Sequence, residues 1–355
     1  MLALVAKREA ASMFKVLMQS VMLMFALCGN VAHGAVILQY HHVANDTPPA
    51  TSVSPAQFSA HLDALERLKF RVIPLNQLLD EVKEGLDPRE NVAAITFDDG
   101  YADINQNALP LLEKKGWVAS VFVTTDEIGA GSSMLTAEQL QDISARGHLV
   151  LNHSASHAYM IRRQQGESEN AWISRARAEI NGAQSELGKV LGKEPVKIFA
   201  YPYGEQNSAL QALLKDLGYI ALGQQTGALD ANTNWQLVPR VSINSRYAEW
   251  EALENKVLAL PMPVQNVLPP DGVTENSEET LVLTLPLDWR TKSLNCFASN
   301  QPVRPRIVVN TSSNLIDVIL NTPVPLGRSR VNCTAPAGEG RFYWYSWMWI
   351  RQDEN

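Results

Sequence analysis

The spacing of apolar residues between positions 36 and about 260 limits this chain to few folds. Short apolar runs alternate there with longer stretches in which apolar residues recur every three or four positions. Such runs are typical of buried strands, and such stretches of amphipathic helices. Regular alternation of strand and helix favours a parallel sheet, because a helix returns the chain to the start of each new strand. Over this length the pattern predicts an α/β fold, with a (β/α) barrel as the architecture.

The expected elements follow from these periodicities. Strands are predicted at residues 36–40, 93–97, 119–123, 148–151 and 197–201. Helices are predicted at residues 55–69, 107–115, 136–146, 169–191 and 208–217.

The pattern changes near Pro261. Residues 261–280 are rich in proline and acidic residues, a composition typical of a linker. Beyond them helical periodicity gives way to strand alternation, with leucine at every second position from Leu281 to Leu287. The sequence therefore predicts a barrel domain over residues 35–260, a linker over 261–280 and a β-rich accessory domain over 281–355.

The N-terminus has the order of a secretory signal. Basic residues up to Lys15 precede an apolar run over residues 16–28, and small residues then lead to Gly34. The run is shorter than the roughly 20 apolar residues that span a bilayer. We therefore predict a signal peptide over residues 1–34 and export to the periplasm or the extracellular space. An uncleaved signal, or a lipid on Cys28, would instead leave the protein associated with the membrane.

The other two of the 3 cysteines, Cys296 and Cys333, lie in the C-terminal segment. In an oxidising compartment they form a natural disulfide pair, and two buried free thiols are the alternative.

Composition excludes several classes of protein. With 46% hydrophobic and 19% charged residues, the chain is globular rather than disordered. The net charge of −7 has the wrong sign for a phosphate backbone, so no nucleic-acid partner is expected. The sequence does not indicate an oligomeric state.

Three polar segments each follow or end an expected strand. They are Thr-Phe-Asp-Asp-Gly at 96–100, His-Ser-Ala-Ser-His at 153–157 and Tyr-Pro-Tyr-Gly at 201–204. The loops at the carboxyl ends of parallel strands converge on one face, so these segments are expected to meet.

Their residue types indicate a hydrolytic metal centre. Adjacent Asp98 and Asp99 repel one another unless a cation compensates them. His153 and His157 project the same way if their segment forms one helical turn. Two imidazoles and one carboxylate make an open three-ligand site, and the second carboxylate is left free as a base. Such a set accepts Zn, Co, Ni or Fe with little discrimination.

Taken together, the three segments resemble the polysaccharide deacetylases of carbohydrate esterase family four, also called the nodulation-deacetylase homology domain. The resemblance implies a distorted (β/α) barrel and one divalent metal ion, zinc first, held by Asp99, His153 and His157. It implies that Asp98 is the general base and that the backbone N–H of Tyr203 binds the oxyanion. The implied reaction removes N-acetyl groups from a polysaccharide and releases acetate.

The resemblance covers roughly residues 36–245. Residues 39–43 and 48–54 also resemble the openings of exported deacetylases that act on biofilm poly-β-1,6-N-acetylglucosamine. Deacetylation of peptidoglycan or chitin-like oligomers is the alternative with the same chemistry.

Two departures from the family pattern bear on catalysis. Relatives often carry an arginine where this chain has Ala200, and Arg240 is the candidate to supply that charge instead. Many relatives also use a late histidine as general acid, but no histidine follows the third segment here. His41, after the first expected strand, is the candidate acid, and return of the proton by Asp98 is the alternative. These departures also leave open a relative that binds glycan with little or no hydrolysis.

The chain ends in an aromatic segment at residues 342–350. As a strand it would place Tyr343, Tyr345, Trp347 and Trp349 on one face, and one of its two faces must be core. The other face could stack on sugar rings, or both faces could be buried between the two domains.

Overall fold

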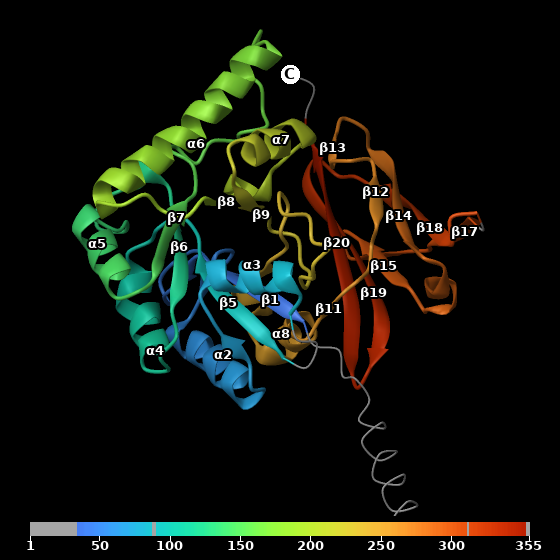
Figure 1. Cartoon of the computed structure of the whole chain (residues 1–355), viewed down its shortest axis with the longest axis horizontal. Helices are drawn as coiled ribbons and strands as arrows, with labels where there is room; N and C mark the ends of the chain where they lie inside the picture. The colour runs from blue at the N-terminus through green and yellow to red at the C-terminus, as the bar shows by residue number, and fades with distance from the viewer. Residues whose placement is uncertain (1–33, 87–89, 311, 353–355) are drawn as a thin grey trace, which may run out of the picture.

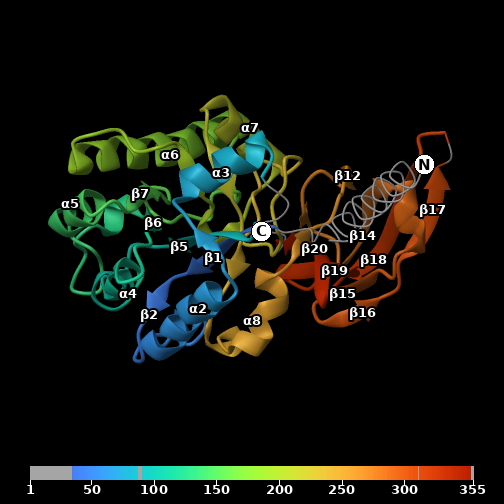
Figure 2. The same ribbon diagram turned by 60° about the horizontal axis from the view of Figure 1, so that its bottom comes forward.

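The computed structural model describes residues 34–86, 90–310 and 312–352. Cys28 and the expected signal peptide, apart from Gly34, lie outside these residues. The described chain forms a barrel unit and a β-sandwich unit that lie side by side (Figure 1; Figure 2). In these described residues, no helix has the length and apolar character needed to cross a membrane.

The barrel unit is built on eight parallel strands in the order β10–β1–β5–β6–β7–β8–β9, with β4 also paired to β5. The strands are β1 (Ala35–Tyr40), β4 (Arg71–Val72), β5 (Val92–Phe97), β6 (Ala119–Val123), β7 (Leu149–Asn152), β8 (Ile198–Ala200), β9 (Ile220–Leu222) and β10 (Val241–Ser242).

The sheet closes irregularly. At one edge, Leu38 of β1 pairs with Val241 of β10. At the other edge, Leu222 of β9 forms an isolated bridge to Val238, three residues before β10 begins. This bridge replaces a regular β9–β10 ladder, and the fold is therefore a distorted (β/α) barrel, as expected.

Helices surround this sheet (Figure 1). They are α2 (Pro55–Arg67), α3 (Leu75–Glu84), α4 (Leu109–Glu113), α5 (Ala137–Ala145), α6 (Glu169–Leu191), α7 (Ser208–Asp216) and α8 (Trp250–Val257). Short helical turns are η1 (Ile104–Ala108), η2 (Thr125–Glu127), η3 (Pro202–Gly204) and η4 (Ser245–Tyr247), and β2 (His42–Val43) pairs with β3 (Ser52–Val53). Helix α2 begins where the Ser54 side chain accepts a hydrogen bond from the Gln57 N–H in a capping box.

Strand β1 shows why the barrel strands are apolar along their whole length. Val36 and Leu38 belong to one buried cluster, whereas Ala35 and Ile37 belong to another. Successive side chains of a strand point to opposite faces, and both faces of this sheet are covered. Gln39 is the exception in β1: it is polar and fully buried.

The sandwich unit consists of two sheets. One has the order β11–β20–β19–β15–β16, with β13 also paired to β20, and the other has the order β12–β14–β18–β17. The strands are β11 (Leu260–Pro261), β12 (Asn266–Leu268), β13 (Val273–Thr274), β14 (Glu278–Pro286), β15 (Asn295–Ala298), β16 (Gln301–Val303), β17 (Arg306–Asn310), β18 (Leu315–Pro323), β19 (Gly327–Gly338) and β20 (Arg341–Arg351), with the helical turn η5 (Leu287–Thr291) after β14.

A shared core joins the two sheets. Leu281, Leu283 and Leu285 of β14 are buried in it, as their alternation predicts. A disulfide between Cys296 and Cys333 links neighbouring strands β15 and β19 of the larger sheet.

Residues 261–280, expected as a linker, carry the short strands β12 and β13, the last residue of β11 and the first residues of β14. Gly272 shows how closely this segment lies against β20, because a Cβ there would meet the Met348 carbonyl oxygen at 1.9 Å. Only glycine fits such an approach.

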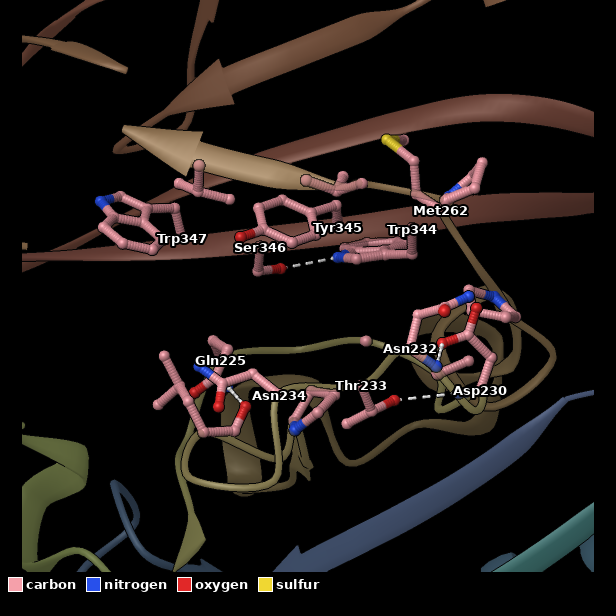
Figure 3. A pocket seen from close by; sticks show the side chains of 18 of the residues that line it. Gln225, Asp230, Asn232, Thr233, Asn234, Met262, Trp344, Tyr345, Ser346 and Trp347 are labelled. Carbon is pink, nitrogen blue, oxygen red and sulfur yellow. Dashed lines mark hydrogen bonds between the residues drawn. The ribbon is translucent and has the colours of Figure 1, made fainter. Parts of the chain in front are cut away.

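Strand β20 lies between the two units. Trp347 and Trp349 pack in the sandwich core, whereas Met348 and Ile350 pack with barrel residues such as Phe199. At Trp347 and Trp349 the aromatic row is therefore packing surface rather than a free platform. Beside it, a cleft of about 370 Å³ separates Trp344 and its neighbours from the barrel loop that carries Asp230 and Asn234 (Figure 3).

Candidate active site

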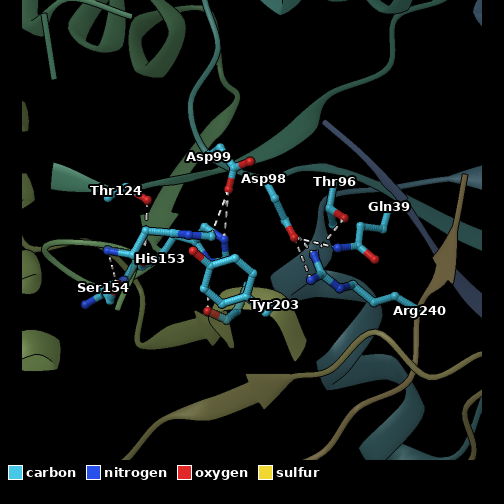
Figure 4. Close-up of polar contacts among 12 residues, drawn as sticks. Gln39, Thr96, Asp98, Asp99, Thr124, His153, Ser154, Tyr203 and Arg240 are labelled. Carbon is cyan, nitrogen blue, oxygen red and sulfur yellow. Dashed lines mark hydrogen bonds and ion pairs between the residues drawn. The ribbon is translucent and has the colours of Figure 1, made fainter. Parts of the chain in front are cut away.

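The three polar segments meet at the carboxyl ends of the barrel strands (Figure 4). Asp98 and Asp99 directly follow β5, and His153 directly follows β7. Tyr203 lies in η3, just after β8, and Arg240 directly precedes β10. The parallel sheet thus gathers residues that are far apart in the sequence.

Asp99, His153 and His157 form one compact group. Their candidate ligand atoms all lie within 4.8 Å of one another. The Nε2 atoms of His153 and His157 each lie 3.2 Å from Asp99 Oδ1. His153 Nδ1 lies 2.8 Å from the Ala200 carbonyl oxygen, which can accept only if Nδ1 carries the proton. The neutral His153 ring therefore presents a lone pair at Nε2, toward Asp99.

Backbone strain is concentrated at this group. Asp99, Ser154, His157 and Tyr203 all have positive φ, from 55° to 73°. Residues other than glycine rarely adopt this conformation, which costs of order 1–3 kcal/mol when the surroundings impose it. Such outliers are typical of functional sites.

Asp98 and Arg240 form a fully buried ion pair behind this group (Figure 4). The two Nη atoms of Arg240 donate to the two carboxylate oxygens of Asp98 at 2.7 and 2.8 Å. Gln39 Nε2 also donates to Asp98, at 2.6 Å, and Arg240 Nε donates to the Gly223 carbonyl oxygen. Ala200, where relatives often carry the arginine, offers no charge, and Arg240 pairs with Asp98 from another part of the barrel.

The surroundings of Asp98 and Asp99 favour the ionised form of both carboxylates. Burial alone would raise the pKa of Asp98, but the Arg240 guanidinium and the hydrogen bonds that it donates hold that pKa below its usual value. Burial also opposes the charge of Asp99, and contacts with His153 and His157 lower the pKa of Asp99 well below its usual value.

A pocket of about 590 Å³ opens in front of these residues, and His41, Asp99, His157 and Tyr203 line it. His41 follows β1, and its Nδ1 is buried without a hydrogen-bond partner among the described residues. Burial lowers the pKa of His41 despite the nearby charges of Asp98 and Asp99. The structure thus brings all seven predicted site residues to this pocket or directly behind it.

Tyr203 is held by contacts on both sides. Its ring stacks on Tyr159 with centroids 4.0 Å apart, and it packs against the His157 ring in an edge arrangement with centroids 4.4 Å apart. Arg328 of β19 donates from Nη1 to the Tyr203 carbonyl oxygen, and its guanidinium lies 5.5 Å from the Tyr203 ring. Arg328 also lines the pocket, so the sandwich unit contributes directly to the site.

Sequence reasoning missed Gln39 and Arg328. Gln39 could have been recognised from the sequence, because it is a polar residue in an otherwise apolar run at the start of the barrel. Nothing in the sequence marks Arg328 as a site residue, since its position at the site depends on how the two units pack.

Comparisons with known proteins agree with the fold and the motifs. A family model described as polysaccharide deacetylase matches residues 85–222. The poly-beta-1,6-N-acetyl-D-glucosamine N-deacetylase of Staphylococcus aureus (strain MSSA476) is 25% identical over 219 residues, which cover 58% of this chain and 74% of that protein.

Solved structures of other proteins share the fold, and two of them illustrate the match. The deacetylase PplD of Streptococcus pyogenes, in complex with acetate, aligns with a TM-score of 0.56 at 21% identity and covers 64% of this chain and 99% of that one. IcaB from Ammonifex degensii aligns with a TM-score of 0.54 at 22% identity and covers 64% of this chain and 98% of that one.

Proposed function

The chain carries a polysaccharide deacetylase domain, and from this premise we propose that it removes N-acetyl groups from poly-β-1,6-N-acetylglucosamine with the help of one divalent metal ion. The observation that carries the proposal is the convergence of Asp99, His153 and His157 beside the buried Asp98–Arg240 pair. The name of the Staphylococcus aureus relative supports the choice of polymer.

The residues present fit a metal ion. Asp99 Oδ1 is buried and accepts no hydrogen bond within the described chain, although two imidazole Nε2 atoms lie 3.2 Å away. A carboxylate oxygen and two imidazole nitrogens gathered this closely are a donor set that binds a divalent cation. Asp99, His153 and His157 would hold that ion, with zinc as the first choice. A divalent cation supplies Lewis-acid chemistry: it polarises a carbonyl group and makes water more acidic.

The chain's own residues supply the remaining chemistry. Asp98, kept ionised by Arg240, accepts the proton of the attacking water as general base. The backbone N–H of Tyr203 stabilises the oxyanion that forms at the acetamide carbonyl. When the C–N bond breaks, His41 gives the departing nitrogen a proton, and the products are acetate and a free amine. Return of the proton by Asp98 is the alternative for this last step.

Export to the periplasm or the extracellular space is part of the proposal, because a polymer outside the cell is accessible only there. The signal-like N-terminus and the cysteine pair support export.

Acetate release tests the proposal. The protein from Ala35 onward should release acetate from β-1,6-linked N-acetylglucosamine oligomers when zinc or cobalt is added, and Asp99→Ala should abolish release. Asp216→Ala, which removes an exposed carboxylate at the end of α7, is the matched control and should retain activity. Release from chitin or peptidoglycan fragments alone would change the substrate, and metal binding without any release would favour a glycan-binding protein.

A further inference from the structure

A second pocket lies where the barrel meets the larger sheet of the sandwich, and its volume of about 390 Å³ is typical of ligand sites. Its lining includes the two cations Lys256 and Arg330, together with three aromatic rings and three amides, among them Phe342, Trp344, Asn300 and Asn332. None of the described residues that line it is an aspartate or a glutamate.

The two cations lack counter-charges. Within the described residues, no carboxylate lies within ion-pair distance of Lys256 Nζ or of the Arg330 guanidinium. Lys256 Nζ instead lies 4.5 Å from the centroid of the Tyr247 ring. Burial lowers the pKa of Lys256, and the nearby Arg330 lowers it further. Two partly desolvated positive charges without a carboxylate, in a chain of net charge −7, favour a bound anion.

This pocket adjoins the catalytic pocket. Arg328 and Arg330 are two residues apart on β19, so their side chains lie on one face of the sheet, with Cα atoms roughly 7 Å apart. Arg328 lines the catalytic pocket and Arg330 lines the second pocket. The two pockets are therefore neighbours along β19, and Asn332, next on the same face, extends the lining of the second pocket.

We propose that the second pocket binds the carboxylate of an acidic sugar in the glycan whose acetamide group lies in the catalytic pocket. The planar Arg330 guanidinium matches a carboxylate in two parallel hydrogen bonds, and Lys256 adds a point charge. The Trp344 ring, fixed by its hydrogen bond to Ser346 at 2.8 Å, offers an apolar surface to the sugar ring. The inference rests on the proposed reaction, removal of N-acetyl groups from a glycan, and it replaces the neutral homopolymer by a glycan in which acidic sugars stand among the N-acetylglucosamine units.

Titration calorimetry with two oligosaccharides of equal length tests this site. One consists of N-acetylglucosamine alone, and the other alternates N-acetylglucosamine with glucuronic acid. The unaltered protein should bind the acidic oligosaccharide more tightly, and added salt should reduce the preference. Arg330→Gln should weaken binding of the acidic oligosaccharide about tenfold or more and leave binding of the neutral one unchanged.

Control variants separate charge from folding. Arg306→Gln removes an exposed cation from the other sheet and should leave both affinities unchanged. Arg330→Lys keeps the charge and should retain part of the preference. If circular dichroism shows that Arg330→Gln is unfolded, Lys256→Gln takes its place. Two results would overturn the inference. One is that the unaltered protein shows no measurable binding of the acidic oligosaccharide, and the other is that the variant loses affinity equally for both oligosaccharides.

Acetate release from the neutral oligomer, measured on the same preparations, keeps the two proposals distinct. Release without a preference for the acidic ligand overturns only the acidic site. A preference for the acidic ligand without release from any oligomer overturns only the proposed deacetylation.

Discussion

At the scale of single residues, Arg240 has a large predicted effect on stability. Its ion pair with Asp98 has no exposed surface, so Arg240→Gln would leave a buried carboxylate without its counter-charge. Removing one partner of a buried pair costs about 3–5 kcal/mol. We expect the free energy of unfolding, measured by urea denaturation, to fall by about that amount, and acetate release to fall with it.

Arg71 provides the control for this prediction. It pairs with Glu81 at 2.6 Å, but its side chain is 39% exposed. Exposed pairs contribute about 0–1 kcal/mol, so Arg71→Gln should change the free energy of unfolding by no more than that. If Arg240→Gln and Arg71→Gln lowered the free energy of unfolding equally, burial would not be the reason that the Asp98–Arg240 pair stabilises the fold.

At the scale of elements, β20 couples the two units. Trp349 is only 1% exposed and packs in the sandwich core, so Trp349→Ala should lower the free energy of unfolding by about 3–5 kcal/mol. Val309→Ala on β17, where the side chain is 43% exposed, should have little effect. Loss of glycan binding by a Trp349→Ala protein of unchanged stability would instead revive a sugar-binding role for this strand.

The disulfide between β15 and β19 makes a separate prediction. The bonded cysteines are 37 residues apart, and removing a native disulfide typically costs about 2–5 kcal/mol. Cys296→Ser with Cys333→Ser should therefore lower the thermal unfolding midpoint. An unchanged midpoint under oxidising conditions would mean that the packing of the two sheets alone determines stability.

The sequence predicts helices well where the apolar period extends over many residues, and strands well where a run of residues is apolar throughout. The helix expected at 169–191 and the strand expected at 119–123 match α6 and β6 in both bounds. Strands β12 and β13 were not predicted, because two or three residues carry no period and their proline-rich surroundings resemble a linker. The candidate metal ligands could be predicted from local motifs. The contact of Arg328 with Tyr203 could not, because it depends on packing between segments that are distant in the sequence.

At the scale of the whole molecule, the sandwich unit takes part in the catalytic pocket through Arg328. Because this residue bonds the Tyr203 carbonyl oxygen and lies near its ring, it positions the backbone N–H proposed to bind the oxyanion. Small displacements of a positioned group can cost up to about 100-fold in rate. We therefore expect Arg328→Gln to lower kcat for acetate release about ten- to 100-fold.

The same variant should leave the unfolding midpoint nearly unchanged, because the Arg328 side chain is 41% exposed and its removal opens no cavity. Arg290→Gln, which alters another exposed arginine of the sandwich unit, is the matched control and should leave kcat unchanged. A rise in KM with constant kcat would assign Arg328 to ligand binding instead. Unchanged kinetics would mean that the sandwich unit supports the barrel without touching its chemistry, since no other described residue of that unit is among those that line the catalytic pocket.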